Sequence, residues 1–243
     1  MLLEIKNVSK SFGGLLALSN LSFTVAQGDV VGLIGPNGSG KSTAFNIVAG
    51  TFPPTSGQVF LQGKEITGLS AHQVSARGIA RSFQLVRPFL HLTALQNVMT
   101  GRLYGHHPAT GPKQAKAEAL EILEFIGLAG KHAQKASSLT VMERKWLEMG
   151  RALATRPKLL LLDEFMAGLT PTEVTAAMKL ISGLKEQDIT VIVVEHIVKA
   201  VMNLSNHVVV LNAGTKIAEG TPDEVSRNPQ VIKAYLGDRY AAR

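Results

Sequence analysis

The sequence predicts an α/β protein in which helices flank a mostly parallel sheet. Short apolar runs recur between helical stretches, and because they do not alternate with polar residues they indicate strands covered on both faces. The first run leads into a glycine-rich segment that opens a helix. The 243 residues, 45% hydrophobic and 18% charged, suffice for one large core. The runs are "VVGLIG" at 30–35, "KLLLLDE" at 158–164, "TVIVVEH" at 190–196 and "HVVVLNAG" at 207–214.

Two stretches ahead of most of these strands have a different pattern. Residues 3–12 and 21–29 alternate apolar and polar side chains, as half-buried antiparallel strands do. They predict a smaller N-terminal antiparallel β subdomain beside the main sheet.

Helix signals dominate residues 85–155, where no strong strand pattern occurs. "LTALQNVMTGRL" has helical spacing, and "KQAKAEALEILEFIGLAG" is a good helix former that should end near Gly127 or Gly130. We therefore predict one domain, 1–243, whose α/β core comprises residues 1–84 and 156–243, with a helical subdomain at 85–155 inserted into it.

Composition excludes several classes of protein. The chain has no cysteine, so disulfides, thiolate metal sites and cysteine nucleophiles are absent. No apolar run approaches about 18 residues, and no secretion signal is evident, so we expect neither a membrane span nor export. The net charge is +7, and residues 1–117 carry the whole excess with ten basic and three acidic residues. This asymmetry favours a polyanion such as a nucleotide, a nucleic acid or an anionic lipid surface.

The segment "GPNGSGKST" fits the pattern G-x-x-x-x-G-K-[ST] between a predicted buried strand and a helix. Backbone N–H groups and a helix N-terminus can wrap phosphate oxygens there, because glycine permits close approach. Lys41 would contact the outer phosphates and Ser42 would bind Mg²⁺. The segment predicts the core of a P-loop NTPase. Its candidate nucleotide-binding residues are Gly35, Pro36, Asn37, Gly38, Ser39, Gly40, Lys41, Ser42 and Thr43.

Two acidic residues end the run at 158–164. Asp163 at the carboxyl end of a buried strand can hold Mg²⁺ directly or through water. Glu164 follows it and is a candidate to orient or deprotonate an attacking water. Acidic residues at strand ends are common, so this pair alone is a weak signal. Together with the phosphate loop upstream it indicates a nucleotide and metal site.

Three further polar or aromatic residues are candidates by position. His196 follows a strand and can bond a γ-phosphate or sense its loss. Gln84 in "IARSFQ" can bridge metal, water and the helical segment, or simply form polar surface. Phe12 in "KSFGG" can stack on a purine or belong to the core of the small sheet.

Residues 137–151, "SSLTVMERKWLEMGR", contain the start of another helix. Thr140 and Glu143 form a capping box in which each side chain binds the other's backbone N–H. The question is whether this helix start serves only the fold or also a ligand.

Together these residues resemble the nucleotide-binding subunit of an ABC transporter, over essentially the whole chain. The order matches that family: Phe12, the loop 35–43, Gln84, a signature segment at 139–143, then Asp163-Glu164 and His196. The chain is most similar to the ATPases of branched-chain amino-acid importers, in "GIARSFQ", "GRALATRPKLLLLDE", "AGLTPTE", "VEHIVKAVMNLS" and "EGTPDEVSRNPQVIKAYLG".

The resemblance implies an ABC ATPase fold and a head-to-tail dimer with two ATPs, bound with Mg²⁺, at its interface. Ser42, Gln84 and Asp163 would hold the metal, Glu164, His196 and Gln84 would be catalytic, and Thr140 would face the partner's ATP. Transmembrane permease subunits would bind Gln84 and the helical subdomain. A periplasmic or extracellular solute-binding protein would act indirectly, and the chain would be peripheral on the cytoplasmic side of the membrane. The basic excess then needs no nucleic acid.

The signature segment departs from the family pattern Leu-Ser-Gly-Gly-Gln. This chain has Leu139-Thr140-Val141-Met142-Glu143, with side chains in place of glycines and a negative charge near a polyanion. Thr170-Pro171 also differs from the general family. We therefore expect a looser contact with the partner's ATP.

Other functions stay open at this point. The chain can be the mainly nucleotide-binding, weakly hydrolytic half of an asymmetric heterodimer, or an importer ATPase for another polar solute such as urea or amides. A soluble GTPase or kinase is disfavoured because no Asn-Lys-x-Asp motif is present. DNA-maintenance ABC ATPases usually carry coiled-coil or zinc insertions, which this chain lacks.

Overall fold

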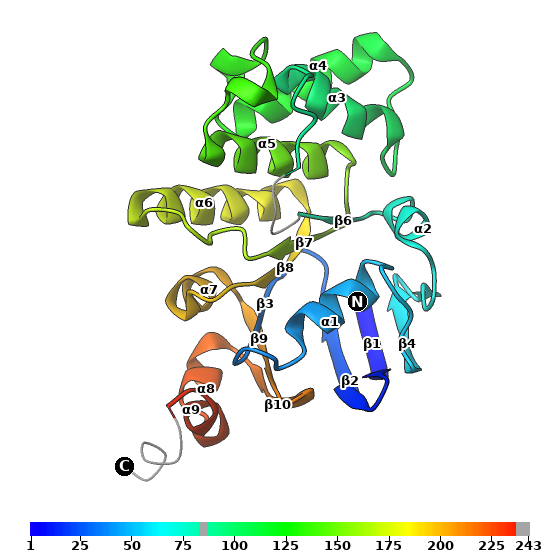
Figure 1. The fold of residues 1–243 in the computed structure, drawn as a ribbon, viewed down its shortest axis with the longest axis vertical. Coiled ribbons are helices and arrows are strands. Elements are labelled where there is room, and N and C mark those ends of the chain that lie inside the picture. The colour runs from blue at the N-terminus through cyan, green and yellow to red at the C-terminus, as the bar shows by residue number, and fades with distance from the viewer. Residues whose placement is uncertain (83–86, 237–243) are drawn as a thin grey trace.

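The computed structural model describes residues 1–82 and 87–236, and its centre is a six-stranded sheet in the order β10-β9-β3-β8-β7-β6 (Figure 1). The strands from β9 to β6 are parallel, and β10 pairs antiparallel with β9 at one edge. The predicted parallel sheet is confirmed. The strands are β3 (Val30–Ile34), β6 (Ile79–Arg81), β7 (Leu159–Asp163), β8 (Thr190–Val194), β9 (His207–Asn212) and β10 (Thr215–Gly220).

A second, four-stranded antiparallel sheet has the order β2-β1-β4-β5. It comprises β1 (Leu3–Phe12), β2 (Leu15–Val25), β4 (Ser56–Leu61) and β5 (Lys64–Glu65). The predicted first strand has the observed bounds. The second begins earlier than predicted, because the turn at Gly13-Gly14 returns the chain directly into pairing with β1.

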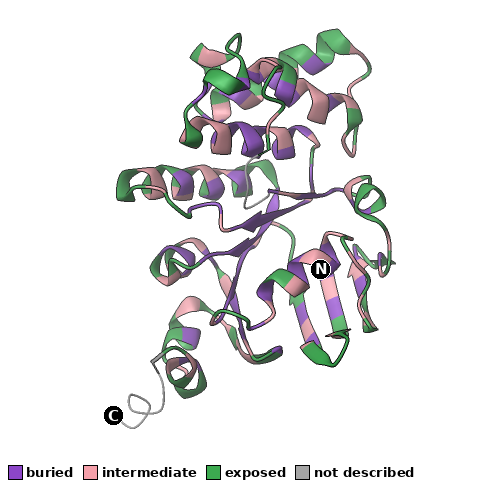
Figure 2. Ribbon diagram, in the orientation of Figure 1, coloured by how far each residue is buried: buried purple, intermediate pink, exposed green. Residues whose placement is uncertain are grey.

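The strands of the central sheet separate two hydrophobic cores. Along β7, Leu160 and Leu162 face the core that contains α5 and α6, whereas Leu159 and Leu161 face the core shared with α1 and the second sheet. This alternation explains why the runs are continuously apolar. Figure 2 shows the buried residues concentrated along these strands.

Helices cover the central sheet on both faces, and α1 lies between the two sheets (Figure 1). Within the described residues, none of the helices is long and apolar enough to cross a membrane. The helices outside the segment between β6 and β7 are α1 (Lys41–Val48), α2 (Ala71–Ser75), α6 (Pro171–Leu184), η3 (Lys185–Gln187), α7 (Val198–Leu204), α8 (Pro222–Ser226) and α9 (Pro229–Leu236).

The segment between β6 and β7 is helical, as predicted. Helix α4 ends just before Gly127, whose φ of +75° suits glycine at a helix terminus. The helices α3, α4 and α5 pack on one another at the top of Figure 1. Their bounds are α3 (Ala94–Tyr104), α4 (Pro112–Phe125), η1 (Ala129–Lys131), η2 (Ala136–Ser138) and α5 (Val141–Ala154). The division at residues 85 and 155 into separate subdomains stays a prediction.

Candidate functional site

The glycine-rich segment connects β3 to α1, and two of its glycines are required by packing. A Cβ on Gly35 would lie 2.1 Å from the carbonyl oxygen of Leu211. A Cβ on Gly40, the N-cap of α1 with φ of 103°, would lie 2.7 Å from Leu18 and 2.8 Å from the Ala17 carbonyl oxygen. Only glycine fits there, so the loop keeps its curvature in front of the α1 N-terminus.

Lys41 stabilises this loop from inside. Its ammonium donates to the carbonyl oxygens of Gly35 at 2.8 Å and Pro36 at 2.9 Å, and the residue is 6% exposed. Burial lowers the pKa of Lys41, whereas the nearby charges of Glu164 and Asp163 act in the opposite direction and favour the ammonium form. Because an ammonium has three protons, one donor is left for a ligand.

The remaining loop residues differ in exposure. Asn37, Gly38 and Ser42 are exposed, and Pro36, Gly40 and Thr43 are half-buried. Ser39 lies under the loop with its side chain buried, and its Oγ finds no hydrogen-bond partner among the described residues. Its carbonyl accepts from the Gly214 N–H at 3.1 Å, which ties the loop to the β9–β10 turn.

Asp163 is the last residue of β7 and pairs with a cation on the neighbouring strand. Its Oδ2 lies 2.7 Å from Nη2 of Arg81, and Nη1 of Arg81 donates to Asn46 of α1 at 2.6 Å. Arg81 therefore connects the predicted metal-binding carboxylate to the helix that follows the phosphate loop.

Glu164 lies just beyond β7 in a left-handed backbone conformation, with φ of +50°. Its N–H donates to the Val194 carbonyl oxygen at 2.8 Å, and its Oε1 lies 2.6 Å from Nε2 of His196. A non-glycine residue with such a φ is uncommon and is often found at functional sites. The structure thus brings Lys41, Asp163, Glu164 and His196 into one electrostatic cluster.

Phe12 ends β1 and is 45% exposed. Its ring meets Phe52 edge-on with centroids 5.3 Å apart, and Nζ of Lys10 lies 5.1 Å from both centroids. The same hairpin continues to Ala17, which packs on Gly40. An exposed aromatic ring therefore lies on the hairpin that borders the phosphate loop.

Gln84 and Thr140 are the remaining predicted site residues. Gln84 lies outside the described residues. Thr140 is the exposed N-cap of α5, in the inserted helices. Its predicted capping box is present: Oγ1 accepts from the Glu143 N–H at 3.3 Å, and Oε2 of Glu143 accepts from the Thr140 N–H at 2.9 Å.

Two charged partners near the site were missed by sequence reasoning. Lys131 forms an ion pair with Glu143, so the negative charge that departs from the family pattern is compensated. Arg81 pairs with Asp163 across 82 residues of sequence. Arg81 ends a strand, as Asp163 does, and this is a weak signal that the two form an ion pair. No local pattern in the sequence predicts the ion pair of Lys131.

These residues fit a nucleotide with a divalent cation. The loop supplies N–H groups at a helix N-terminus and an ammonium for phosphates, while the exposed Ser42 and the carboxylate of Asp163 are the oxygen ligands that Mg²⁺ prefers. The tight contacts at Gly35 and Gly40 fix the course of the loop against the β9–β10 turn and the β1–β2 hairpin.

Comparisons with known sequences also indicate a nucleotide-binding protein. The profile of the ABC transporter family matches residues 18–167, and that of the branched-chain amino acid ATP-binding cassette transporters matches residues 215–241. The high-affinity branched-chain amino acid transport ATP-binding protein BraF of Pseudomonas aeruginosa is 39% identical and covers 98% of both chains.

Solved structures agree with the sequence comparisons. The ADP conformation of MJ1267, an ATP-binding cassette of an ABC transporter, matches with a TM-score of 0.87 and 33% identity over 98% of this chain and 99% of that chain. The dimeric post-hydrolysis state of the cassette MJ0796, bound to ADP and Pi, matches with a TM-score of 0.80 and 27% identity over 90% and 98%. The chain therefore has the ABC ATPase fold and belongs to the ATP-binding subunits of ABC transporters, in the branched-chain amino-acid group.

Proposed function

We propose that this chain hydrolyses ATP with Mg²⁺ to energise the import of branched-chain or related amino acids. The observation that carries the proposal is the cluster in which the charges of Asp163 and Glu164 act on the phosphate-loop Lys41, while Glu164 also bonds His196. Such a cluster serves phosphoryl transfer, in which positioning and charge stabilisation supply most of the catalysis.

Each residue has a defined part in this proposal. The N–H groups of residues 35–43 and the ammonium of Lys41 bind the phosphates, and Phe12 stacks on the purine. Ser42, Asp163 and Gln84 hold Mg²⁺, which when bound neutralises phosphate charge. Oε of Glu164 accepts the proton of the attacking water, with Gln84 as an aid in orienting it.

His196 restrains the catalytic carboxylate. Its Nε2 bonds Oε1 of Glu164 at 2.6 Å, and this bond orients the carboxylate that we propose accepts the proton from water. His196 is half exposed, so it can also reach the γ-phosphate. The contact therefore supports a role for His196 in catalysis.

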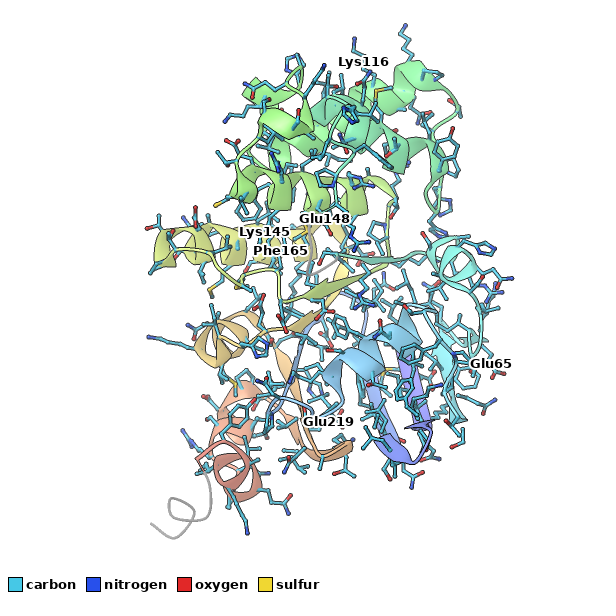
Figure 3. The ribbon with its side chains drawn as sticks, viewed as in Figure 1. Glu65, Lys116, Lys145, Glu148, Phe165 and Glu219 are labelled. Atoms are coloured by element: carbon cyan, nitrogen blue, oxygen red, sulfur yellow. The ribbon has the colours of Figure 1, made fainter. Side chains whose placement is uncertain are left out.

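The decisive experiment is Glu164→Gln, which keeps the size of the side chain but removes its basicity. We expect kcat to fall by at least about 100-fold, as for loss of a general base, while MgATP binding is retained. Glu65→Gln, on an exposed strand of the second sheet (Figure 3), is the matched control and should leave kcat unchanged. Unchanged turnover in Glu164→Gln would refute the role of Glu164.

Two copies would sandwich two ATPs, each bound by one copy's phosphate loop and the other's α5. The dimeric MJ0796 cassette supports this arrangement by similarity. The N-terminus of α5 presents free N–H groups, and the Lys131–Glu143 pair removes a repulsive charge from that end.

An asymmetric heterodimer is the second candidate, because Val141 at this helix start is 73% exposed and bulky. In that case a partner ATPase would complete the competent site. Changing Val141 and Met142 to glycine should increase ATP-driven dimerisation if their bulk weakens the contact. An unchanged dimerisation constant would show that the segment already docks and would disfavour this second candidate.

The permease subunits would bind a groove of about 920 Å³ between the central sheet and the inserted helices. Phe89 and Tyr104 on its rim are 48% and 84% exposed, and its floor contains Arg81 and Asp163. Exposed aromatic side chains beside a concave surface are typical of a protein interface. We propose that residues 85–155 move as a subdomain with the bound permease, at the cytoplasmic face of the membrane.

The solute is inferred from relatives such as BraF, whose name specifies branched-chain amino acids. The choice of solute would belong to the permease and a solute-binding protein rather than to this chain. Uptake of labelled leucine, urea and acetamide in cells with and without the gene distinguishes the possibilities. Loss of leucine uptake alone supports the proposal, and loss of urea or amide uptake alone would refute it.

A further inference from the structure

The three residues after Glu164 are held by side chains from two other elements. Nζ of Lys145 on α5 donates to the carbonyl oxygens of Phe165, at 3.1 Å, and Ala167. From the opposite direction, Oε1 of Glu195 at the end of β8 accepts from the N–H of Met166 at 2.6 Å. Consecutive backbone groups of the segment 165–167 are thus bound by side chains rather than by a regular ladder.

Both holding residues are poorly accessible to water. Glu195 is 3% exposed and Lys145 is half-buried, and Figure 3 shows Lys145 beside Phe165 beneath α5. Burial lowers the pKa of Lys145 and raises that of Glu195, while the charge of each favours the ionised form of the other. Hydrogen bonds at such sites are costly to remove, because the remaining partners stay buried.

The held segment also packs tightly. Met166 is fully buried, and the ring of Phe165 lies with its centroid 5.4 Å from that of Trp146, the neighbour of Lys145 on α5. Residues 165–167 therefore have little freedom relative to α5.

The segment leads directly from Glu164, whose backbone conformation is one that a non-glycine residue rarely adopts. The Ala167 N–H closes a turn onto the Glu164 carbonyl oxygen at 3.1 Å. An unfavourable conformation persists only where the surroundings fix it. The bonds from Lys145 and Glu195 supply that restraint on one side of Glu164, and the Val194 carbonyl supplies it on the other.

We propose that Lys145 and Glu195 are positioning residues that orient the Glu164 carboxylate by fixing the backbone of residues 165–167. Because Lys145 belongs to the helix that begins at Thr140, the same contact transmits movement of α5 to Glu164 within one subunit. The proposal rests on the proposed role of Glu164 and adds a link between the signature helix and hydrolysis.

Paired substitutions at each position test it. Lys145→Met removes the donor and Lys145→Arg keeps one, while Glu195→Leu removes the acceptor and Glu195→Gln keeps one. Lys116→Met is the matched control, because Lys116 is exposed on α4 in the same helical segment (Figure 3). ATP turnover is measured on the complex that copurifies with the tagged chain, together with Tm and hydrogen exchange of the amides at 165–167.

We expect Lys145→Met to lower kcat about tenfold, the effect of losing a hydrogen bond to a charged group, with KM for ATP within about twofold. Exchange at 165–167 should accelerate, Lys145→Arg should restore kcat to within about threefold, and Lys116→Met should behave as the parent. Glu195→Leu should likewise lower kcat and accelerate exchange at 165–167, and Glu195→Gln should restore both. These two variants provide the test if Lys145→Met does not fold.

A parental kcat in Lys145→Met or Glu195→Leu would overturn the proposal. So would a loss of kcat that follows only the folded fraction and is not restored by the conservative variant. Glu164→Gln distinguishes failure of the proposed function from failure of the positioning role. If Glu164→Gln has parental turnover, the catalytic role of Glu164 is refuted. If Glu164→Gln is inactive and Lys145→Met is fully active, only the positioning role is refuted.

Discussion

Glu143 is a carboxylate at the N-terminus of a helix that we propose faces a polyphosphate. Neighbouring residues compensate its negative charge. The ammonium of Lys131 donates to its side chain, and Thr140 contributes a backbone N–H and its hydroxyl. These contacts, led by that of Lys131, hold the pKa of Glu143 below its ordinary value of 4.5. The residue therefore stabilises the fold in its ionised form.

This shift predicts a pH dependence of stability. A carboxyl whose pKa is lower in the folded state stabilises the protein fully above pH 4.5, and the contribution is lost as the pH falls through the folded-state pKa. Lys131→Met should therefore lower Tm at pH 7 and flatten the decline of Tm below about pH 4.5. Thermal unfolding from pH 3 to pH 7 measures both effects. Parallel Tm profiles for the two proteins would contradict the assignment.

At the scale of elements, helix α5 combines three connections. Thr140 caps its start. Lys145 in its first turns donates to the backbone of the segment 165–167. Its later residues contact Arg87 and Phe89, which follow β6 in the chain. There, Oε2 of Glu148 accepts from the Arg87 N–H at 3.3 Å, and Arg151 lies 4.5 Å from the centre of the Phe89 ring. One helix thus contacts the segment that follows Glu164 and lines the groove that contains Phe89, while its capped start is exposed.

The cap of α5 can be separated from its proposed ligand by comparison with α3. Thr93 forms the same capping box with Gln96 at the start of α3, in the same helical segment. Thr140→Ala and Thr93→Ala should each lower the free energy of unfolding by about 1 kcal/mol. Only Thr140→Ala should also weaken ATP-driven dimerisation, by about tenfold. Chemical denaturation and analytical ultracentrifugation give the two quantities, and equal dimerisation of the variants would exclude a ligand contact by Thr140.

At the scale of the whole molecule, the groove that we propose binds the permease is lined by Phe89 and Tyr104 as well as by Asp163. A partner seated there would therefore lie close to the carboxylate of Asp163, which we propose binds Mg²⁺. Arg81 lies on the same floor and bonds both Asp163 and Asn46, so displacement of β6 would reach the phosphate-loop helix as well.

Tyr104 provides the test of this surface, because it is 84% exposed and contributes little to the core. Tyr104→Ser should reduce copurification of the membrane subunits at least about tenfold, as expected for an aromatic anchor at an interface, with MgATP affinity unchanged. Leu15→Ser removes an apolar side chain that is 69% exposed on the other sheet and serves as the control. Equal copurification of both variants would place the permease elsewhere.

The sequence predicted those parts whose signal is local. Lys41, Asp163 and Glu164 were recognisable because the phosphate loop and the acidic strand end have fixed spacing next to apolar runs. The cap at Thr140 needed only four consecutive residues. The left-handed backbone of Glu164 was not predictable, because it results from bonds to Val194 and to the segment 165–167 rather than from its own preference.

Long-range partners were also missed. Arg81, Lys131 and Lys145 are ordinary surface residue types, and their roles depend on packing between segments far apart in the chain. Among the residues that the structure describes, seven non-glycine residues have positive φ, and no turn motif singled out Glu164 among them. The proposed roles of the site residues, Lys41, Asp163 and Glu164 included, remain predictions for the experiments above.

The contact between Trp146 and Phe165 has a spectroscopic consequence. Trp146 is the only tryptophan of the chain and is 8% exposed, so its emission comes from a single buried ring. That ring lies on α5 and touches the segment that follows Glu164. Any rotation of α5 against the central sheet changes the surroundings of this fluorophore. The protein thus carries an intrinsic optical reporter of the contact between α5 and the segment after Glu164, and stopped-flow mixing with ATP and Mg²⁺ can test the proposed coupling without an added label.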